Sequence, residues 1–160
     1  LKTGYAICPP AILRQLLEQK GNHDFGSSNL CQHIVYEAMT DGSYREHLSA
    51  VHAGYRKKRD TMLAAMDRYF PKSSNASWTH PAGGLYVWLS LPRDADTSRS
   101  GGMFEKALKE GVLYVPGEYC FTPDANGHVP QNHMRLCYAV TPLEQIEPGV
   151  ERLAKVIRAC

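Results

Sequence analysis

The sequence predicts an α/β protein with a long helix over residues 43–71, followed by a small α+β domain of about three strands packed by helices. Two observations carry this prediction. Apolar residues recur at helical spacing through residues 43–71, and shorter segments after residue 72 alternate apolar and polar side chains, which is typical of half-buried strands. The length of 160 residues suits one domain or one domain with an appendage.

The first 42 residues are predicted to contain a short strand and two helices. Residues 1–8 alternate loosely, as a strand does. A helix follows from Pro10, because proline is tolerated in a first turn, and Gly21 ends it. Asn29 is expected to cap the second helix, and Gly42 to close it.

The strongest helix signal begins at residue 43. The stretch 43–46, Ser-Tyr-Arg-Glu, has the pattern of a capping box, and Pro71 ends the helix. Such a helix is about 40 Å long at about 1.5 Å per residue, longer than a small domain is wide. We therefore expect it to bridge two parts, which gives three divisions: residues 1–42, 43–71 and 72–160.

The small domain begins with a strand, a helix and a second strand. Leu, Val, Leu and Leu alternate with Tyr, Trp and Ser over residues 85–91, which predicts a strand. A short helix is expected over residues 103–110, and a brief strand over residues 112–115. Pro116-Gly117 then forms a turn dipeptide.

The last part is predicted to contain a loop, a strand and a broken helix. Residues 118–132 are rich in Gly, Pro, Asn and Asp and are expected to be loop. The strand "NHMRLCYAV" follows at 132–140. A helix starts after Pro142, but proline disrupts a helix interior, so Pro148 should separate a short first turn from a second helix that ends near Ala159.

Composition narrows the function classes. Lys and Arg number 18 against 16 acids, for a net charge of +2, which gives no reason to expect nucleic-acid contacts. The basic run at residues 56–59 is interpreted as a solvated helix face. No stretch is long and apolar enough for a membrane span or a signal segment, so we expect a cytoplasmic protein. The chain lacks an initiator Met, so we expect a fragment of a longer protein.

The cysteines and histidines predict neither a disulfide framework nor a metal site. The five cysteines are scattered and include no C-x-x-C pair, and the seven histidines show no H-x-x-x-H spacing. Reduced thiols are the simplest interpretation in a cytosolic protein.

Arg135 is the residue that spacing singles out. It lies in the strand at 132–140, on the face opposite the apolar side chains, where a permanent charge is costly unless an anion meets it. Spacing leaves open two sources for the anion that meets Arg135. An internal acid such as Glu118 or Asp124 would make a structural ion pair, and a ligand would make a binding site.

Four motifs in order identify a family. "LKTGYAICPP", "HPAGGLYVWLSLP", "GVLYVPGEYCF" and "MRLCYA" resemble the C-terminal third of fold type I pyridoxal-phosphate aminotransferases, in particular the 2-aminoadipate, kynurenine and MocR-like subgroup. The predicted long helix is similar to the helix that joins the large and small domains of that family. The resemblance implies that the chain is the C-terminal portion of an aminotransferase fold and that residues 1–42 form the edge of the cofactor domain.

The resemblance also implies roles for two residues. Arg135 matches the arginine that forks onto the substrate α-carboxylate, and this favours the ligand interpretation. Lys2 matches an arginine that helps hold the cofactor phosphate. The lysine that forms the Schiff base with pyridoxal phosphate is absent from these 160 residues, so they contain no catalytic residue and alone should be inactive. The family's substrates are amino acids and 2-oxo acids, and its members are typically homodimers.

The sequence is compatible with three functions. The parent protein is expected to be an aminotransferase. Alternatively, the chain belongs to a MocR-type transcription regulator, in which an aminotransferase-like domain senses an effector for a DNA-binding domain. A third alternative is a purely structural small domain whose Arg135 pairs internally. Tyr119 and Phe121 match the segment near the substrate side chain, either as pocket lining or as plain packing.

Overall fold

The computed structural model describes residues 3–70 and 75–160 and divides the chain into two compact units, Leu1–Val51 and His52–Cys160. The long helix α3, Ser43–Tyr69, contributes residues to both units. No helix in the described ranges is long and apolar enough to cross a bilayer. The predicted α/β class is confirmed.

The first unit contains α1 (Pro10–Asp24), α2 (Asn29–Thr40) and the start of α3. The predicted opening strand is wrong for its described part, because residues 3–9 have no regular structure. A strand needs a partner for its backbone hydrogen bonds, and none is present for this segment in the described chain. The predicted end of α1 at Gly21 is also wrong, because a helix-interior glycine costs only about 1 kcal/mol. The helix instead continues to Asp24, and Phe25 caps its end with a left-handed φ of 51°.

The predicted helix caps differ in detail from those observed. Ser28, not Asn29, caps α2, and its Oγ accepts from the backbone N–H of Cys31 at 3.4 Å. Ser43 does not form the predicted capping box: its Oγ donates to the carbonyl of Ala38 at 3.4 Å. Side chains that reach backwards in this way compete with capping of their own helix.

The second unit is built on a four-stranded antiparallel sheet with the order β1-β2-β4-β3. The strands are β1 (Ser77–Trp78), β2 (Tyr86–Ser90), β3 (Val115–Pro116) and β4 (His133–Cys137). The sequence predicts about three of them, but the strand expected over residues 112–115 is observed only at 115–116, because residues 112–114 are not paired with β4. The fourth, β1, has two residues, which is too short to show an alternating pattern. Both edge strands are this short, and short edges discourage pairing with other chains.

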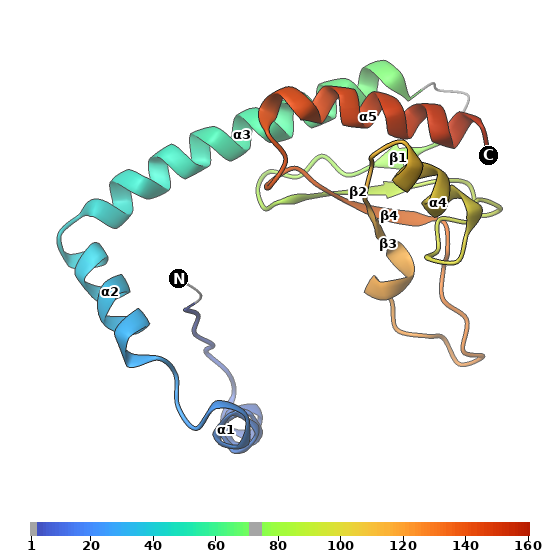
Figure 1. The fold of residues 1–160 in the computed structure, drawn as a ribbon. Helices are drawn as coiled ribbons and strands as arrows, with labels where there is room; N and C mark the ends of the chain where they lie inside the picture. The colour runs from blue at the N-terminus through green and yellow to red at the C-terminus, as the bar shows by residue number, and fades with distance from the viewer. Residues whose placement is uncertain (1–2, 71–74) are drawn as a thin grey trace. The chain divides into compact units, whose positions relative to one another are not determined.

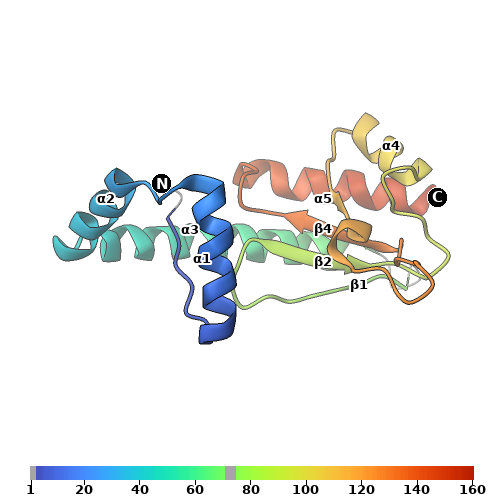
Figure 2. The same ribbon diagram turned by 90° about the horizontal axis from the view of Figure 1, so that it is seen from below.

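One face of the sheet is covered by helices. The end of α3 and the helix α5 (Leu143–Arg158) lie on it, and α4 (Gly102–Lys109) contacts α5 (Figures 1 and 2). The predicted helix at 103–110 is therefore confirmed to within one residue at each end. Together the helices and the sheet bury an apolar core, whose largest fully buried apolar side chains are Tyr138, Met66, Leu89, Met134, Leu153 and Val87.

The last helix is continuous, so the predicted break at Pro148 is wrong. α5 runs through it, and the helix buries Ile146 before the proline and Val150 after it in the same core. Glu147 also ties this part of α5 to α3, since its carboxylate accepts from Arg68 at 3.0 Å and Tyr69 at 3.1 Å. This packing outweighs the missing backbone hydrogen bond.

Replacing Pro148 by alanine is therefore expected to stabilise the protein. The change restores an N–H donor to the helix interior, where proline costs about 3 kcal/mol, but it also loosens the unfolded chain by about 0.4–1 kcal/mol. We expect the free energy of unfolding to rise by about 2–2.6 kcal/mol. Denaturant unfolding of the full-length protein measures it, and an unchanged or lower stability would contradict the prediction.

Candidate functional site

The face of the sheet opposite the helices carries the candidate site. The register places Tyr86 opposite Cys137, Trp88 opposite Arg135, and Ser90 opposite His133. These six residues, here called the open face, alternate with the buried residues of β2 and β4. The alternation expected for both strands is thereby confirmed.

Arg135 lies on the open face, and no acid among residues 3–70 and 75–160 pairs with it. Its side chain is partly buried, its Nε is buried with no hydrogen-bond partner, and its guanidinium carbon lies 4.4 Å from the ring centroid of Tyr86. The face of an aromatic ring attracts a cation but leaves the planar N–H edge free. A buried donor without a partner costs about 1–3 kcal/mol, which an anionic ligand would relieve.

The two acids that spacing offered to Arg135 bind elsewhere. Glu118 accepts from the backbone N–H of Arg99 at 2.8 Å. Asp124 accepts from two backbone N–H groups of its own turn, which lowers its carboxyl pKa. The described residues thus contain no ion pair with Arg135, and the structural ion pair is not formed.

Three rings pack beside Arg135 on the same side of the sheet. His133 stacks on Trp88 at 5.5 Å between centroids, and Phe121 contacts both rings at 5.3 and 5.7 Å. The Nδ1 atom of His133 also lies 2.9 Å from Ser90 Oγ. Phe121 therefore packs against the sheet, whereas Tyr119 is 65% exposed.

Burial lowers the pKa of His133 below its ordinary value of about 6.5. The unfolded chain then binds this proton more readily than the folded chain, so stability falls as the pH drops below about 6.5. We expect His133→Phe to flatten this dependence, because phenylalanine keeps the stacking and does not titrate. Unfolding free energies at pH 7.5, 6.5 and 5.5 measure it, with His128→Gln as the exposed control. Equal slopes in wild type and His133→Phe would contradict the prediction.

Pro116-Gly117 does not form the predicted turn. Pro116 ends β3, and Gly117 opens a short 3-10 helix, η2 (Gly117–Cys120). A Cβ atom on Gly117 would lie 2.5 Å from the Cβ of His133 and 2.7 Å from its carbonyl oxygen. Glycine is needed here for close approach to β4, not for an unusual φ angle.

Lys2 lies outside the described residues. The five cysteines are free thiols. Within the described ranges, no group of three or more His, Cys, Asp or Glu side chains could hold a metal ion.

Sequence reasoning missed Arg59. It belongs to the basic run whose pattern indicates a solvated helix face, yet its side chain is only 20% exposed and reaches the loop before β2. Besides Asp60, its partners are carbonyl groups 22 and 23 residues away, and carbonyl partners leave no trace in side-chain patterns.

Comparisons with known proteins agree with the fold. The family model for aminotransferase class I and II matches residues 1–153. A 2-aminoadipate transaminase of Thermus thermophilus is 36% identical over 99% of this chain and 37% of its own. A similar solved structure is that of LysN, the alpha-aminoadipate aminotransferase of Thermus thermophilus, complexed with N-(5'-phosphopyridoxyl)-L-leucine. Its sequence is 36% identical, and its structure superimposes with a TM-score of 0.78 over 96% of this chain and 37% of that chain.

A regulator is also similar. The HTH-type transcriptional regulator YisV of Bacillus subtilis is 31% identical over 99% of this chain and 30% of its own length. The chain thus spans little more than a third of the aminotransferases that it matches, and less of the regulator.

Proposed function

Because the chain belongs to the aminotransferase class I and II family, we propose that it is the C-terminal part of a pyridoxal-phosphate-dependent enzyme that moves an amino group from an amino acid to a 2-oxo acid. The observation that carries the proposal is the guanidinium of Arg135, which lies on the open face against Tyr86 and pairs with no acid of the described residues.

Arg135 binds the substrate α-carboxylate in this proposal. A planar guanidinium donates two parallel hydrogen bonds to a carboxylate, which fixes the orientation as well as the affinity. Tyr86 supports the guanidinium from one face and leaves its edge open to the substrate. Orientation matters because the Cα–H bond must stand at a defined angle before it breaks.

The cofactor belongs to the proposal for the full protein. Pyridoxal phosphate supplies the electron sink for breaking the bonds of the substrate Cα. Arg135 fits the carboxylate end of a substrate. Lys2, which the family resemblance assigns to the cofactor phosphate, lies outside the described residues.

The wider organisation is proposed on the same basis. Residues 1–42 would belong to the cofactor domain, residues 43–71 to the connecting helix, and residues 72–160 to the small domain. That α3 contributes to both compact units supports this division. A cytoplasmic homodimer is the expected form of the whole protein.

An assay on the full-length protein tests the proposal. Purified protein with added pyridoxal phosphate is incubated with a panel of amino acids and 2-oxo acids, and new amino acids are measured by chromatography. We expect transfer for at least one pair and a new visible absorption band from bound cofactor. Absence of both would overturn the proposed enzyme.

A second candidate function is effector sensing for a transcription regulator, which the similarity to YisV favours. Arg135 would then hold the carboxylate of an effector. Full-length protein that binds DNA in a mobility-shift assay, changes that binding when an amino acid is added, and transfers no amino group would select this function. Transfer without DNA binding would reject it.

A further inference from the structure

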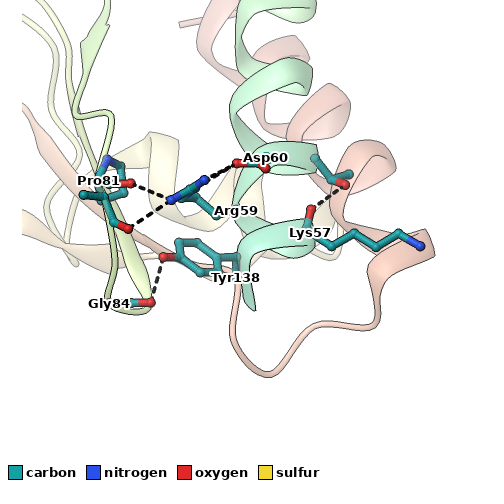
Figure 3. A network of polar contacts seen from close by, with 8 residues as sticks. Lys57, Arg59, Asp60, Pro81, Gly84 and Tyr138 are labelled. Atoms are coloured by element: carbon teal, nitrogen blue, oxygen red, sulfur yellow. Dashed lines mark hydrogen bonds and ion pairs between the residues drawn. The ribbon is translucent and has the colours of Figure 1, made fainter. Parts of the chain in front are cut away.

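Arg59 of α3 binds the loop that leads into β2. Its Nη1 donates to the carbonyl of Ala82 at 3.0 Å and to that of Pro81 at 3.4 Å (Figure 3). Its Nε and Nη2 both contact Asp60 Oδ1, at 2.8 and 2.6 Å. Asp60 thus orients the guanidinium of Arg59 through Nε and Nη2, and Nη1 is left to bind the carbonyls of Pro81 and Ala82.

Tyr138, just after β4, holds the same loop one step further on. Its hydroxyl donates to the carbonyl of Gly84 at 2.8 Å (Figure 3), and its backbone N–H donates to the carbonyl of Leu85 at 3.2 Å. The Tyr138 side chain is buried, so its hydroxyl has a fixed direction. Gly84 has a φ of 86°, a left-handed conformation that favours glycine.

The residue that follows this loop supports Arg135. Leu85 alone separates Gly84 from Tyr86, whose ring lies 4.4 Å from the guanidinium carbon of Arg135. Four of the five carbonyls of residues 81–85, those of residues 81, 82, 84 and 85, are therefore bound by two side chains and one backbone N–H. A loop held at so many points fixes the entry of β2, and with it the position of the Tyr86 ring.

We propose that Arg59 and the Tyr138 hydroxyl are positioning residues for the substrate carboxylate. They hold residues 81–85, so that the Tyr86 ring keeps the guanidinium of Arg135 in the orientation in which it can bind the substrate carboxylate through two hydrogen bonds. Neither side chain needs to touch the substrate. The proposal rests on the proposed aminotransferase function and adds two residues to it.

The physical consequence is a loss of selectivity for the carboxylate rather than a loss of fold. Ala82 is exposed and Pro81 is only partly buried, so water can replace Arg59 at their carbonyls. The loop then gains freedom, and Tyr86 no longer fixes Arg135. The interaction weakened is one made in both the substrate complex and the transition state, so KM should rise more than kcat falls.

The test compares two substrates on the full-length protein with pyridoxal phosphate. One is the best amino acid of the panel, and the other is the primary amine that lacks its carboxylate. We expect Arg59→Gln to lower kcat/KM for the amino acid by about tenfold, mainly through KM, with little change for the amine. Tyr138→Phe removes only the hydroxyl and should lower kcat/KM for the amino acid by about threefold.

Lys57→Gln is the matched control. Lys57 lies two residues before Arg59 on α3, its side chain extends away from the network in Figure 3, and its ammonium makes no hydrogen bond or ion pair in the described chain. Lys57→Gln removes one positive charge, as Arg59→Gln does, so a difference between the two variants cannot come from net charge. For Lys57→Gln we expect the ratio of kcat/KM for the amino acid to kcat/KM for the amine to equal that of wild type.

Two failures can be told apart. If wild type transfers no amino group, the proposed function fails and the inference goes with it. If wild type is active and Arg135→Gln loses activity, but Arg59→Gln changes both substrates equally or changes only the melting temperature, the positioning role alone is overturned.

Discussion

If the proposed function holds, we expect replacement of Arg135 by glutamine to lower kcat/KM of the full-length protein for amino acid substrates by about 100- to 1,000-fold. Hydrogen bonds to a charged group contribute about 1.5–3 kcal/mol each, and the fork makes two with one carboxylate. A loss of about 3–4 kcal/mol corresponds to this range of rates. Initial rates with the best amino acid of the panel measure it.

Arg135→Lys separates charge from geometry. Lysine keeps the positive charge but loses the planar fork, so we expect a loss that is clear but smaller than that of glutamine. Arg93→Gln removes the charge of an exposed arginine and should leave the rates unchanged. If Arg135→Gln kept kcat/KM within twofold of wild type, Arg135 would not be the carboxylate receptor.

Replacing Gly117 by alanine destabilises the protein by about 1–3 kcal/mol. The added Cβ would lie 2.5 Å from the Cβ of His133 and 2.7 Å from its carbonyl oxygen, so η2 and β4 must move apart. The backbone of His133 cannot yield without disturbing its stacking on Trp88. Denaturant unfolding of the full-length protein measures the loss.

Gly149→Ala is the matched control for Gly117→Ala. Gly149 lies inside α5, and a Cβ there meets nothing within 4 Å. Alanine is the better helix former by about 1 kcal/mol, so this substitution should stabilise the protein. Two glycine-to-alanine changes with opposite signs would attribute the effect to close approach at Gly117. Equal effects would contradict that cause.

Much of the fold could be predicted because it depends on local periodicity. Alternation placed β2 and β4, and helical spacing placed α3, each within a few residues of its observed bounds. The predictions that proved wrong concern segments whose structure depends on contacts with residues distant in sequence. Pro148 remains helical because residues on both sides of it are buried against the sheet. No local rule contains that information.

The candidate site divides in the same way. Arg135 could be found because a charge in an alternating strand is conspicuous in the sequence itself. Tyr86 shows in the sequence only as part of the polar side of its strand, since its contact with Arg135 depends on the register of β2 against β4. Arg59 is hidden among neighbouring basic residues, because only the structure shows that Lys58 and Arg59, and not all four basic side chains, reach distant carbonyl groups.

The pairing of β2 with β4 has a consequence for folding kinetics. Ser90 and His133 lie opposite each other although 43 residues separate them in sequence. Closing such a loop costs roughly 3 kcal/mol of chain entropy, which must be met before the central pair gains any contact. The open face therefore assembles late, and its strand amides should exchange with solvent only when the whole unit unfolds.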